Sequence, residues 1–276
     1  MEIINFGACI NQGTYKLHSK FTNVQNFARD NELISLVTEK VGRGPNNIVL
    51  DKIPETENDS LSVSDCHLYL GGLIFAIQPI KTEIEDIFIY DPKLLVKQIE
   101  ILLNEFSKHP PGIDLSFLLF PEHENNFRSA FEIQFVQQVK LVTSKFNIDN
   151  LPAIGHKMKG LGFGLTPSGD DFNCGILYAL NYINKGKYFK ITDLIDKCYQ
   201  NSLGNNLISN NFLKYAHSNR FYENFFNLLK AMKENNITSI SSYTKQVTNS
   251  GHTSGSDMLT GFIFTLKGVL NEKKFG

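Results

Sequence analysis

The chain contains 276 residues, of which 42% are hydrophobic and 20% are charged, and its formal net charge is −1 at pH 7. This length allows a large hydrophobic core, divided over one or two domains. Because the net charge is close to zero, it provides no general electrostatic attraction to nucleic acid or to an anionic membrane surface. We therefore expect neither of these as a partner.

The cysteines are far apart in the sequence and form neither a CxxC pair nor a Cys/His pattern typical of a metal site. Cysteines of this kind are typical of reduced thiols in a cytosolic protein. The N-terminus has no basic-then-apolar signal, and no apolar run is long enough to cross a bilayer. The sequence thus predicts a cytoplasmic protein. The four cysteines are Cys9, Cys66, Cys174 and Cys198.

Residues 1–90 are rich in short β-forming runs separated by turn residues, and no long helical pattern interrupts them. This spacing favours a small antiparallel sheet or barrel. We therefore expect a β-rich N-terminal domain over residues 1–90. The clearest strands are predicted over residues 32–38, 47–50, 66–70, 72–77 and 84–90.

A loop between two of these predicted strands reads Gly42-Arg43-Gly44-Pro45-Asn46-Asn47. Arginine offers a planar fork that fits a carboxylate or a phosphate, and glycine and asparagine allow the backbone to approach a ligand closely. The same residues are also typical of a simple turn. We keep both interpretations, and the candidate ligand contacts are Arg43, Gly44, Asn46 and Asn47.

Residues 91–276 show mainly helical periodicity, beginning at Asp91-Pro92. Apolar residues at helical spacing predict an amphipathic helix that ends before His109-Pro110-Pro111-Gly112. An aromatic stripe then runs from Phe127 through Phe131 and Phe135, and we interpret it as core. Further helices are predicted over residues 191–203, 206–217, 221–232 and 240–247. The predicted fold class is α+β, with the β-rich region packed on a larger helical domain over residues 91–276.

Within the helical region, residues 160–172 combine alternating glycines, a Thr-Pro-Ser-Gly turn and two aspartates directly before an apolar helix. The aspartates, Asp170 and Asp171, fit the first helical turn, where exposed amides favour negative charge. A glycine-rich loop before a helix is a general anion-binding arrangement, although this one matches neither a P-loop nor a Rossmann fingerprint. The candidate anion contacts are Gly162, Gly164, Thr166, Ser168, Gly169 and Asp170.

A second copy of this pattern stands near the C-terminus, at residues 251–266. Aligning Ser168 with Ser254 places Gly169 on Gly255, Asp171 on Asp257 and Gly175 on Gly261. Both copies read Ser-Gly-x-Asp and then continue into an apolar helix with an internal glycine. Such a repeat has three explanations: an old duplication, two helices that pack through their glycines, or two loops that converge on one ligand.

The chain resembles the AllH family, a bacterial family associated with a subunit of oxamate carbamoyltransferase. The resemblance rests on residues 42–47, residues 162–172 and residues 251–257. It implies a multi-subunit enzyme of purine and allantoin breakdown, with companion subunits. It also implies a reaction that interconverts oxalurate and phosphate with oxamate and carbamoyl phosphate, so that the ligand is a small anionic metabolite.

This reaction suggests roles for the candidate residues. Helix N-terminal amides and nearby hydroxyls suit a phosphate or an oxyanion, Arg43 suits a carboxylate, and His252 suits proton transfer. Asp171 and Asp257 are candidate catalytic residues, and they are tentative Mg²⁺ ligands or helix caps. The second loop adds Thr253, Ser254 and Gly255 as anion contacts. The alternatives are a non-catalytic nucleotide- or metabolite-binding regulatory subunit and a purely structural subunit.

Overall fold

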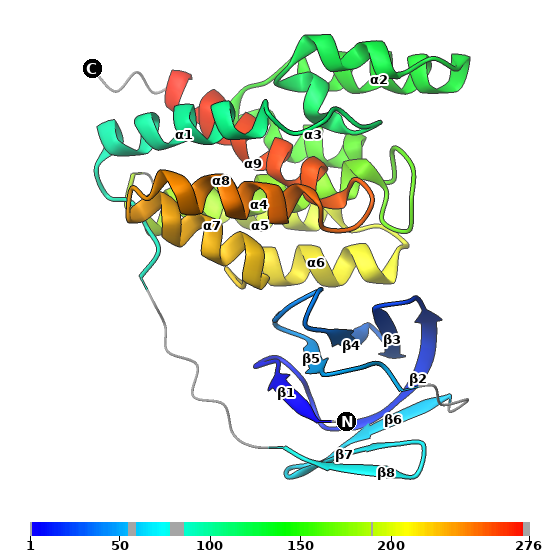
Figure 1. The fold of residues 1–276 in the computed structure, drawn as a ribbon. Helices are drawn as coiled ribbons and strands as arrows, with labels where there is room; N and C mark the ends of the chain where they lie inside the picture. Colours follow the sequence, from blue (N-terminus) through cyan, green and yellow to red (C-terminus); the bar gives the residue numbers. More distant parts are fainter. Residues whose placement is uncertain (1, 55–58, 78–85, 189, 273–276) are drawn as a thin grey trace. The chain divides into compact units, whose positions relative to one another are not determined.

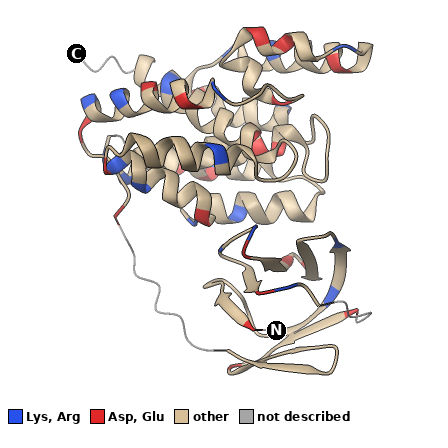
Figure 2. Ribbon diagram, in the orientation of Figure 1, with Lys and Arg blue, Asp and Glu red and all other residues tan. Residues whose placement is uncertain are grey.

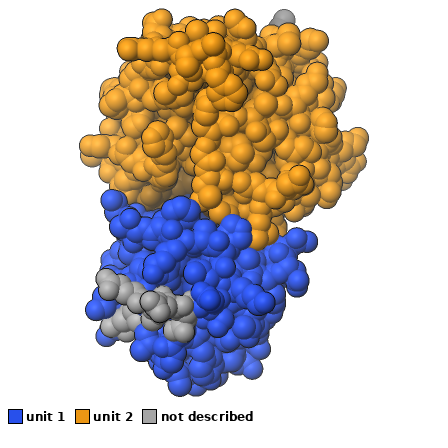
Figure 3. Space-filling model, turned by 90° about the vertical axis from the view of Figure 1, so that its right-hand side faces the viewer, with its two compact units in different colours: residues 1–85, 220–223 blue, residues 86–219, 224–276 orange. Residues whose placement is uncertain are grey.

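The computed structural model describes residues 2–54, 59–77, 86–188 and 190–272. The chain divides into two compact units (Figure 3). Unit 1 comprises Met1–Glu85 together with Arg220–Glu223, and unit 2 comprises Asp86–Asn219 together with Asn224–Gly276. Unit 1 is built from strands and unit 2 from helices (Figure 1), which confirms the predicted α+β class.

The described part of unit 1 forms one eight-stranded sheet, in the order β1-β5-β4-β3-β2-β6-β7-β8. Its core contains Tyr15, Phe27 and Leu36 and is formed by side chains that alternate along the strands. The strands are β1 (Ile3–Phe6), β2 (Gly13–Lys20), β3 (Val24–Arg29), β4 (Glu32–Thr38), β5 (Asn47–Leu50), β6 (Ser60–Val63), β7 (His67–Leu70) and β8 (Leu73–Ala76).

One pair of strands differs from the antiparallel sheet that we predicted. Strands β4 and β5 run parallel, with Ser35 opposite Asn47. The connecting loop must bring the chain back along β4, and the amide of Ser35 donates to the backbone oxygen of Asn46 at 3.0 Å at the end of this return. The loop with Arg43 is therefore a crossover between parallel strands and not a simple hairpin turn.

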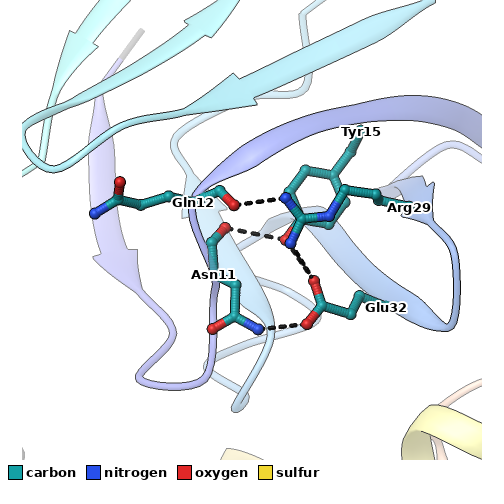
Figure 4. Close-up of polar contacts among 5 residues, drawn as sticks. All are labelled: Asn11, Gln12, Tyr15, Arg29 and Glu32. Carbon is teal, nitrogen blue, oxygen red and sulfur yellow. Dashed lines mark hydrogen bonds and ion pairs between the residues drawn. The ribbon is translucent and has the colours of Figure 1, made fainter.

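A polar network at the ends of β2, β3 and β4 fixes part of unit 1 (Figure 4). Arg29 donates to Glu32 and to the backbone oxygen of Gln12, both at 2.6 Å, and its guanidinium lies over the Tyr15 ring. The Tyr15 hydroxyl and the Asn11 amide also donate to the carboxylate of Glu32. Burial raises the pKa of Glu32, but the hydrogen bonds from these neighbours outweigh it and lower that pKa below its ordinary value.

Helices α3, α5, α6 and α9 pack against α4, in which every residue from Ser168 to Ile183 is buried. Between α1 and α2, and again before α3, short 3-10 turns replace regular helix. The helices are α1 (Pro92–Phe106), α2 (Ala130–Thr143), α3 (Leu151–Met158), α4 (Ser168–Lys185), α5 (Thr192–Ser202), α6 (Leu207–His217), α7 (Glu223–Lys233), α8 (Ile237–Thr248) and α9 (Ser254–Glu272), and the 3-10 turns are η1 (Leu115–Leu118), η2 (Pro121–Asn126) and η3 (Ile148–Asn150).

The strand predicted over residues 84–90 is wrong in its described part, residues 86–90, which forms no strand. Ile87 and Ile89 are buried, as the alternating pattern indicated. Their backbone groups, however, bond to tyrosine hydroxyls of unit 2. The Tyr182 hydroxyl accepts a hydrogen bond from the amide of Ile89 and donates to the backbone oxygen of Ile87. The Tyr188 hydroxyl donates to the backbone oxygen of Ile89. The alternation therefore reflects packing on helices.

The aromatic stripe predicted as core is only partly buried. Helix α2 begins after Ser129, which forms a capping box with Glu132, so Phe127 precedes the helix. Phe135 is buried, but Phe131 lies in the first turn of α2 with 66% of its surface exposed. The centroid of its ring lies 5.4 Å from the ring centroid of Phe163, in the glycine-rich loop.

Helices α4 and α9 touch through their backbones. A Cβ atom on Gly175 would lie 2.1 Å from the backbone oxygen of Met258, and one on Gly261 would lie 2.2 Å from that of Phe172. Neither distance is possible for a real side chain, so the close crossing of the two helices requires glycine at both positions. The interpretation that the repeated helices pack through their glycines is therefore correct.

Among the described residues, positions of Lys and Arg and positions of Asp and Glu are both scattered over the helices and strands (Figure 2). This distribution agrees with the small net charge. None of the helices within the described residues combines the length and the apolar character needed to cross a bilayer.

Replacing Glu32 with glutamine removes the charge at the centre of the network in Figure 4. Because the pKa of Glu32 is lowered in the folded protein, its contribution is present above its ordinary pKa and is lost as pH falls through the lowered value. The pair with Arg29 is partly exposed and screened by water, so we expect a loss of about 1 kcal/mol at neutral pH. Urea unfolding of Glu32→Gln, beside the exposed control Glu39→Gln, should show this loss shrinking in acid. A loss that is independent of pH would contradict the assignment.

Replacing Gly175 with alanine tests the crossing of α4 and α9. Helix propensity alone predicts that alanine stabilises a helix by about 1 kcal/mol. The added methyl group, however, would meet the backbone of α9 and force the helices apart. We expect the free energy of unfolding to fall by about 2 kcal/mol or more, measured by urea denaturation. Unchanged or increased stability would show that the helices do not cross this closely.

Candidate functional site

The two Ser-Gly-x-Asp loops have the same hydrogen-bonding pattern. In the first copy, the amide of Leu161 donates to the last residue of α3, and the amide of Gly169 donates to Leu161. In the second copy, Ser250 and Gly255 make the same two bonds, with Val247 of α8 as the first acceptor. Each copy is therefore a helix, a tight loop and a second helix that begins at the serine.

The equivalent glycines Gly162 and Gly251 both have positive φ, of 102° and 68°, and each lies against the serine of its own loop. The second loop is shorter, because only two residues, His252 and Thr253, separate Gly251 from its serine. The longer first loop contains Thr166, which the second copy lacks.

The two loops meet through their hydroxyl groups. Thr166 Oγ1 lies 3.0 Å from Ser254 Oγ of the other loop and donates to Asp171 Oδ2 at 2.8 Å. The Ser254 hydroxyl also favours the charged form of Asp171. The repeat therefore brings a threonine, a serine and an aspartate from two distant parts of the sequence into contact.

Both aspartates of the repeat are buried in unit 2. Asp171 is 1% exposed and Asp257 is not exposed. Burial raises the pKa of Asp171 to about 7, while the hydroxyls of Thr166 and Ser254 oppose this shift. Burial also raises the pKa of Asp257 well above its ordinary value, and the charge of Asp171 raises it further. The charge of Asp171 thus disfavours the charged form of Asp257.

Two buried oxygen atoms of this centre have no well-formed hydrogen bond to another described residue. They are Ser168 Oγ and Asp257 Oδ2, although Ser168 lies near enough to Asp257 to favour its charged form. The other oxygen, Asp257 Oδ1, accepts from the amide of Leu115 at 2.7 Å. Because buried polar atoms are normally paired, such atoms often indicate a ligand or an ordered water.

The interpretation of these aspartates as helix caps does not fit their contacts. Pro167 is the N-cap of α4, and no side chain caps this helix. Asp170 instead accepts from the amide of Gly160 at 2.7 Å, which closes the glycine-rich loop. Asp171 and Asp257 lie inside the first turns of α4 and α9 and bond across to other segments.

A pocket of about 470 Å³ opens beside the first loop, on the side of Asp170. This pocket matters for the structural-subunit alternative, because that hypothesis expects the loops to be closed by their own side chains with no adjacent pocket. The hydroxyls of Thr166 and Ser168 are indeed buried, but the neighbouring pocket is large enough for a small metabolite. It is lined by Lys159, Gly160, Pro167, Asp170, Leu203, Gly204, Asn205 and Asn206.

The remaining predicted contacts in the two loops differ in exposure. Gly164 and His252 are exposed, and Thr253 is partly exposed. Gly169 and Gly255 are buried, because each packs directly on the backbone of the preceding helix. Their side-chain-free backbones therefore serve the loop fold itself, whereas His252 is open to solvent. The predicted ligand roles of all these residues stay predictions.

The loop of Arg43 belongs to unit 1 and is fixed there by its own contacts. The Arg43 side chain is 62% exposed and lies 3.7 Å from the carboxylate of Glu223, which also accepts the Arg43 amide. The side-chain nitrogen of Asn46 donates to the backbone oxygen of Leu33, and its side-chain oxygen accepts from the Tyr222 hydroxyl. These contacts give the loop a structural role, and its predicted ligand role stays a prediction.

Gly44 and Asn47, the other two predicted ligand contacts of this loop, are also held by contacts within unit 1. Asn47 Nδ2 donates to the backbone oxygen of Gly42 at 3.0 Å. A Cβ atom on Gly44 would lie 2.5 Å from the Tyr222 ring, so the position has no room for a side chain. A ligand contact at Asn47 would have to replace its present hydrogen bond.

The tentative Mg²⁺ site at Asp171 and Asp257 does not fit their surroundings. Mg²⁺ keeps several waters when only one or two carboxylates hold it, whereas both of these side chains are almost fully buried. Nor does any group of three or more potential ligands occur within the described residues.

Sequence reasoning missed a second polar group beside the aspartates. Asp114 caps η1, and Ser116 donates to Asp114 through both its amide and its hydroxyl. The same hydroxyl lies 2.7 Å from His123 Nδ1, and all three side chains are buried. This arrangement fixes the start of η1, where the Leu115 amide contacts Asp257. The Asp-x-Ser sequence after Pro-Pro-Gly is a local capping signal that could have indicated the turn.

Replacing Asp171 with asparagine should change how stability depends on pH. Because the folded protein keeps a proton that the unfolded chain loses above its ordinary pKa of 3.8, stability should fall as pH rises from about 4 to about 7. Asp171→Asn should reduce the fall in unfolding free energy between these two pH values, by an amount on the order of a few kcal/mol.

Urea unfolding across this pH range measures the slope for wild type and Asp171→Asn. The matched control is Asp193→Asn, which changes an exposed aspartate in the first turn of α5. Parallel curves for wild type and Asp171→Asn would show that Asp171 titrates normally.

A family model described as oxamate carbamoyltransferase subunit AllH matches residues 158–266. The matched segment runs from the end of α3 into α9 and contains both Ser-Gly-x-Asp loops. Comparison with curated proteins and with solved structures gives no match. The match over residues 158–266 supports the assignment of this chain to the AllH family.

Proposed function

We propose that this chain is a substrate-binding subunit of an oxamate carbamoyltransferase, and that its two Ser-Gly-x-Asp loops hold reacting groups. One observation carries the proposal. The segment that matches the AllH family is the one in which the loops of α4 and α9 meet, through the 3.0 Å contact of Thr166 and Ser254.

The proposed reaction transfers a carbamoyl group between a nitrogen atom and phosphate. In the direction of oxalurate breakdown, a phosphate oxygen attacks the carbamoyl carbon. The bond between this carbon and the oxamate nitrogen then breaks, and the nitrogen takes up a proton. Catalysis needs a bound phosphate, donors for the carbonyl oxygen and a nearby proton source.

Residues of the two loops offer these functions. The hydroxyls of Thr166 and Ser254 lie at helix N-termini, where negative charge is stabilised, and a protonated Asp171 would free their O–H groups to donate to the substrate. His252 lies on the exposed part of the second loop and suits the proton transfer. Asp171 and Asp257, when protonated, can orient the hydroxyls around them.

The description of the family as a subunit supports companion proteins, so activity is expected from the assembled enzyme. A second candidate is a regulatory subunit that binds a nucleotide or metabolite without turnover. The two candidates differ in one respect: substitutions at the loops should abolish chemistry in the first and alter only ligand response in the second.

We expect the pair of substitutions Thr166→Val and Ser254→Ala to reduce turnover by the assembled enzyme about 100-fold, because donors to a developing oxyanion contribute about that much. Carbamoyl phosphate formation from oxalurate and phosphate is the measurement, alongside melting temperature. The matched control is Ser242→Ala, an exposed serine of α8. Wild-type turnover in the double variant would reject the proposed role of the loops, and turnover by companions alone would favour the regulatory alternative.

A further inference from the structure

We infer that the pocket beside Asp170 binds a small ligand carrying both a carboxylate and an amide N–H, recognised by Lys159 and Asp170. This inference rests on the proposed function, because it assigns the substrate of that function to a specific pocket. Lys159, Gly204 and Asn205 were not among the residues predicted from the sequence.

The pocket lies within unit 2, where three segments come together. These are the end of α3 with Gly160, the start of α4 at Pro167, and the connection of α5 to α6 at residues 203–206. Its volume of about 470 Å³ is within the range of small-molecule sites. The glycine-rich loop that contacts Ser254 thus forms one wall of the pocket, through its two ends.

Lys159 supplies a positive charge whose position is defined. It follows the last residue of α3, and its Nζ donates to the backbone oxygen of Leu203 at 2.9 Å. Its aliphatic stem lies against Gly204, because a Cβ atom on that glycine would be 3.4 Å from two of its carbons. An ammonium group has three donors, and the bond to Leu203 is the one that the Lys159 side chain makes among the described residues, so donors are left for a ligand.

Asp170 supplies the complementary acceptor. It lines the pocket although it is only 5% exposed. The Gly160 amide donates to one of its oxygens at 2.7 Å. Burial raises the pKa of Asp170, while this amide, the hydroxyl of Ser209 and the charge of Lys159 oppose that shift. A carboxylate has about four acceptor positions, so these contacts leave capacity for an N–H group of a ligand.

Because the pocket is lined by one cation and one acceptor-only carboxylate, it discriminates between ligands by their charge and hydrogen-bonding groups. A simple dianion gains from Lys159 but meets repulsion from Asp170, and a cation meets the reverse. A molecule with an anionic end and an N–H end satisfies both side chains. Oxamate has this form, while oxalate has nearly the same size but carries a second carboxylate in place of the amide.

Calorimetric binding of oxamate and oxalate to the full chain, alone and assembled with its companion subunits, tests the inference. Wild type should prefer oxamate. Lys159→Met should weaken binding of both molecules about tenfold or more, because it removes a charged hydrogen bond. Asp170→Asn should instead reduce the preference for oxamate over oxalate, because an amide no longer repels the dianion and can donate to it. A loss of folding cannot produce this change of preference.

The matched control is Lys157→Met, an exposed lysine two residues before Lys159 that does not line the pocket, and it should bind as wild type does. Oxamate binding that survives both Lys159→Met and Asp170→Asn would overturn the inference. So would a wild-type protein that binds no oxamate either alone or assembled with its companion subunits. If the Thr166→Val and Ser254→Ala pair then abolishes binding or turnover, the proposed function stands without this pocket. If that pair leaves turnover unchanged, the proposed role of the loops fails independently.

Discussion

The backbones of α4 and α9 touch at Gly175 and Gly261, and the position of both helix starts follows from this contact. Each glycine lies about two helical turns after the serine of its own copy. Equal spacing from one crossing point allows the two N-termini to come together at the same end of the helix pair. The contact of Thr166 with Ser254 shows that they do. A side chain at either glycine would separate the helices and the loops with them.

This close packing also explains the unusual state of Asp171 and Asp257. Carboxyl groups in the first turn of a surface helix normally face water and favour the charged form. Here the crossing covers both groups with protein, and burial raises both pKa values. Burying two such groups costs folding free energy. Carboxyl groups that are kept in a core at this cost are often part of a functional site. Their contacts to hydroxyls and to the Leu115 amide are consistent with orienting a binding surface.

Much of the helical architecture could be predicted from apolar spacing, and the internal repeat indicated that α4 and α9 are related. Contacts between distant segments could not be predicted in this way. The Leu115 amide and Asp257 are 142 residues apart in the sequence, and no local pattern links them. The strand predicted at residues 86–90 was wrong because alternating burial does not reveal whether strands or tyrosine hydroxyls satisfy the backbone. The parallel pairing of β4 and β5 likewise depends on how their connecting loop folds back.

The site itself was only partly visible in the sequence. The Ser-Gly-x-Asp motifs identified the loops, but their most buried residues bond to one another, while the neighbouring pocket is completed by Lys159 and residues 203–206. An experimental structure of the protein with oxamate bound is the most direct test of the account. We predict ordered oxamate in contact with the loop of residues 159–171, next to the meeting point with Ser254. Oxamate bound elsewhere, without contact to either Ser-Gly-x-Asp loop, would contradict it.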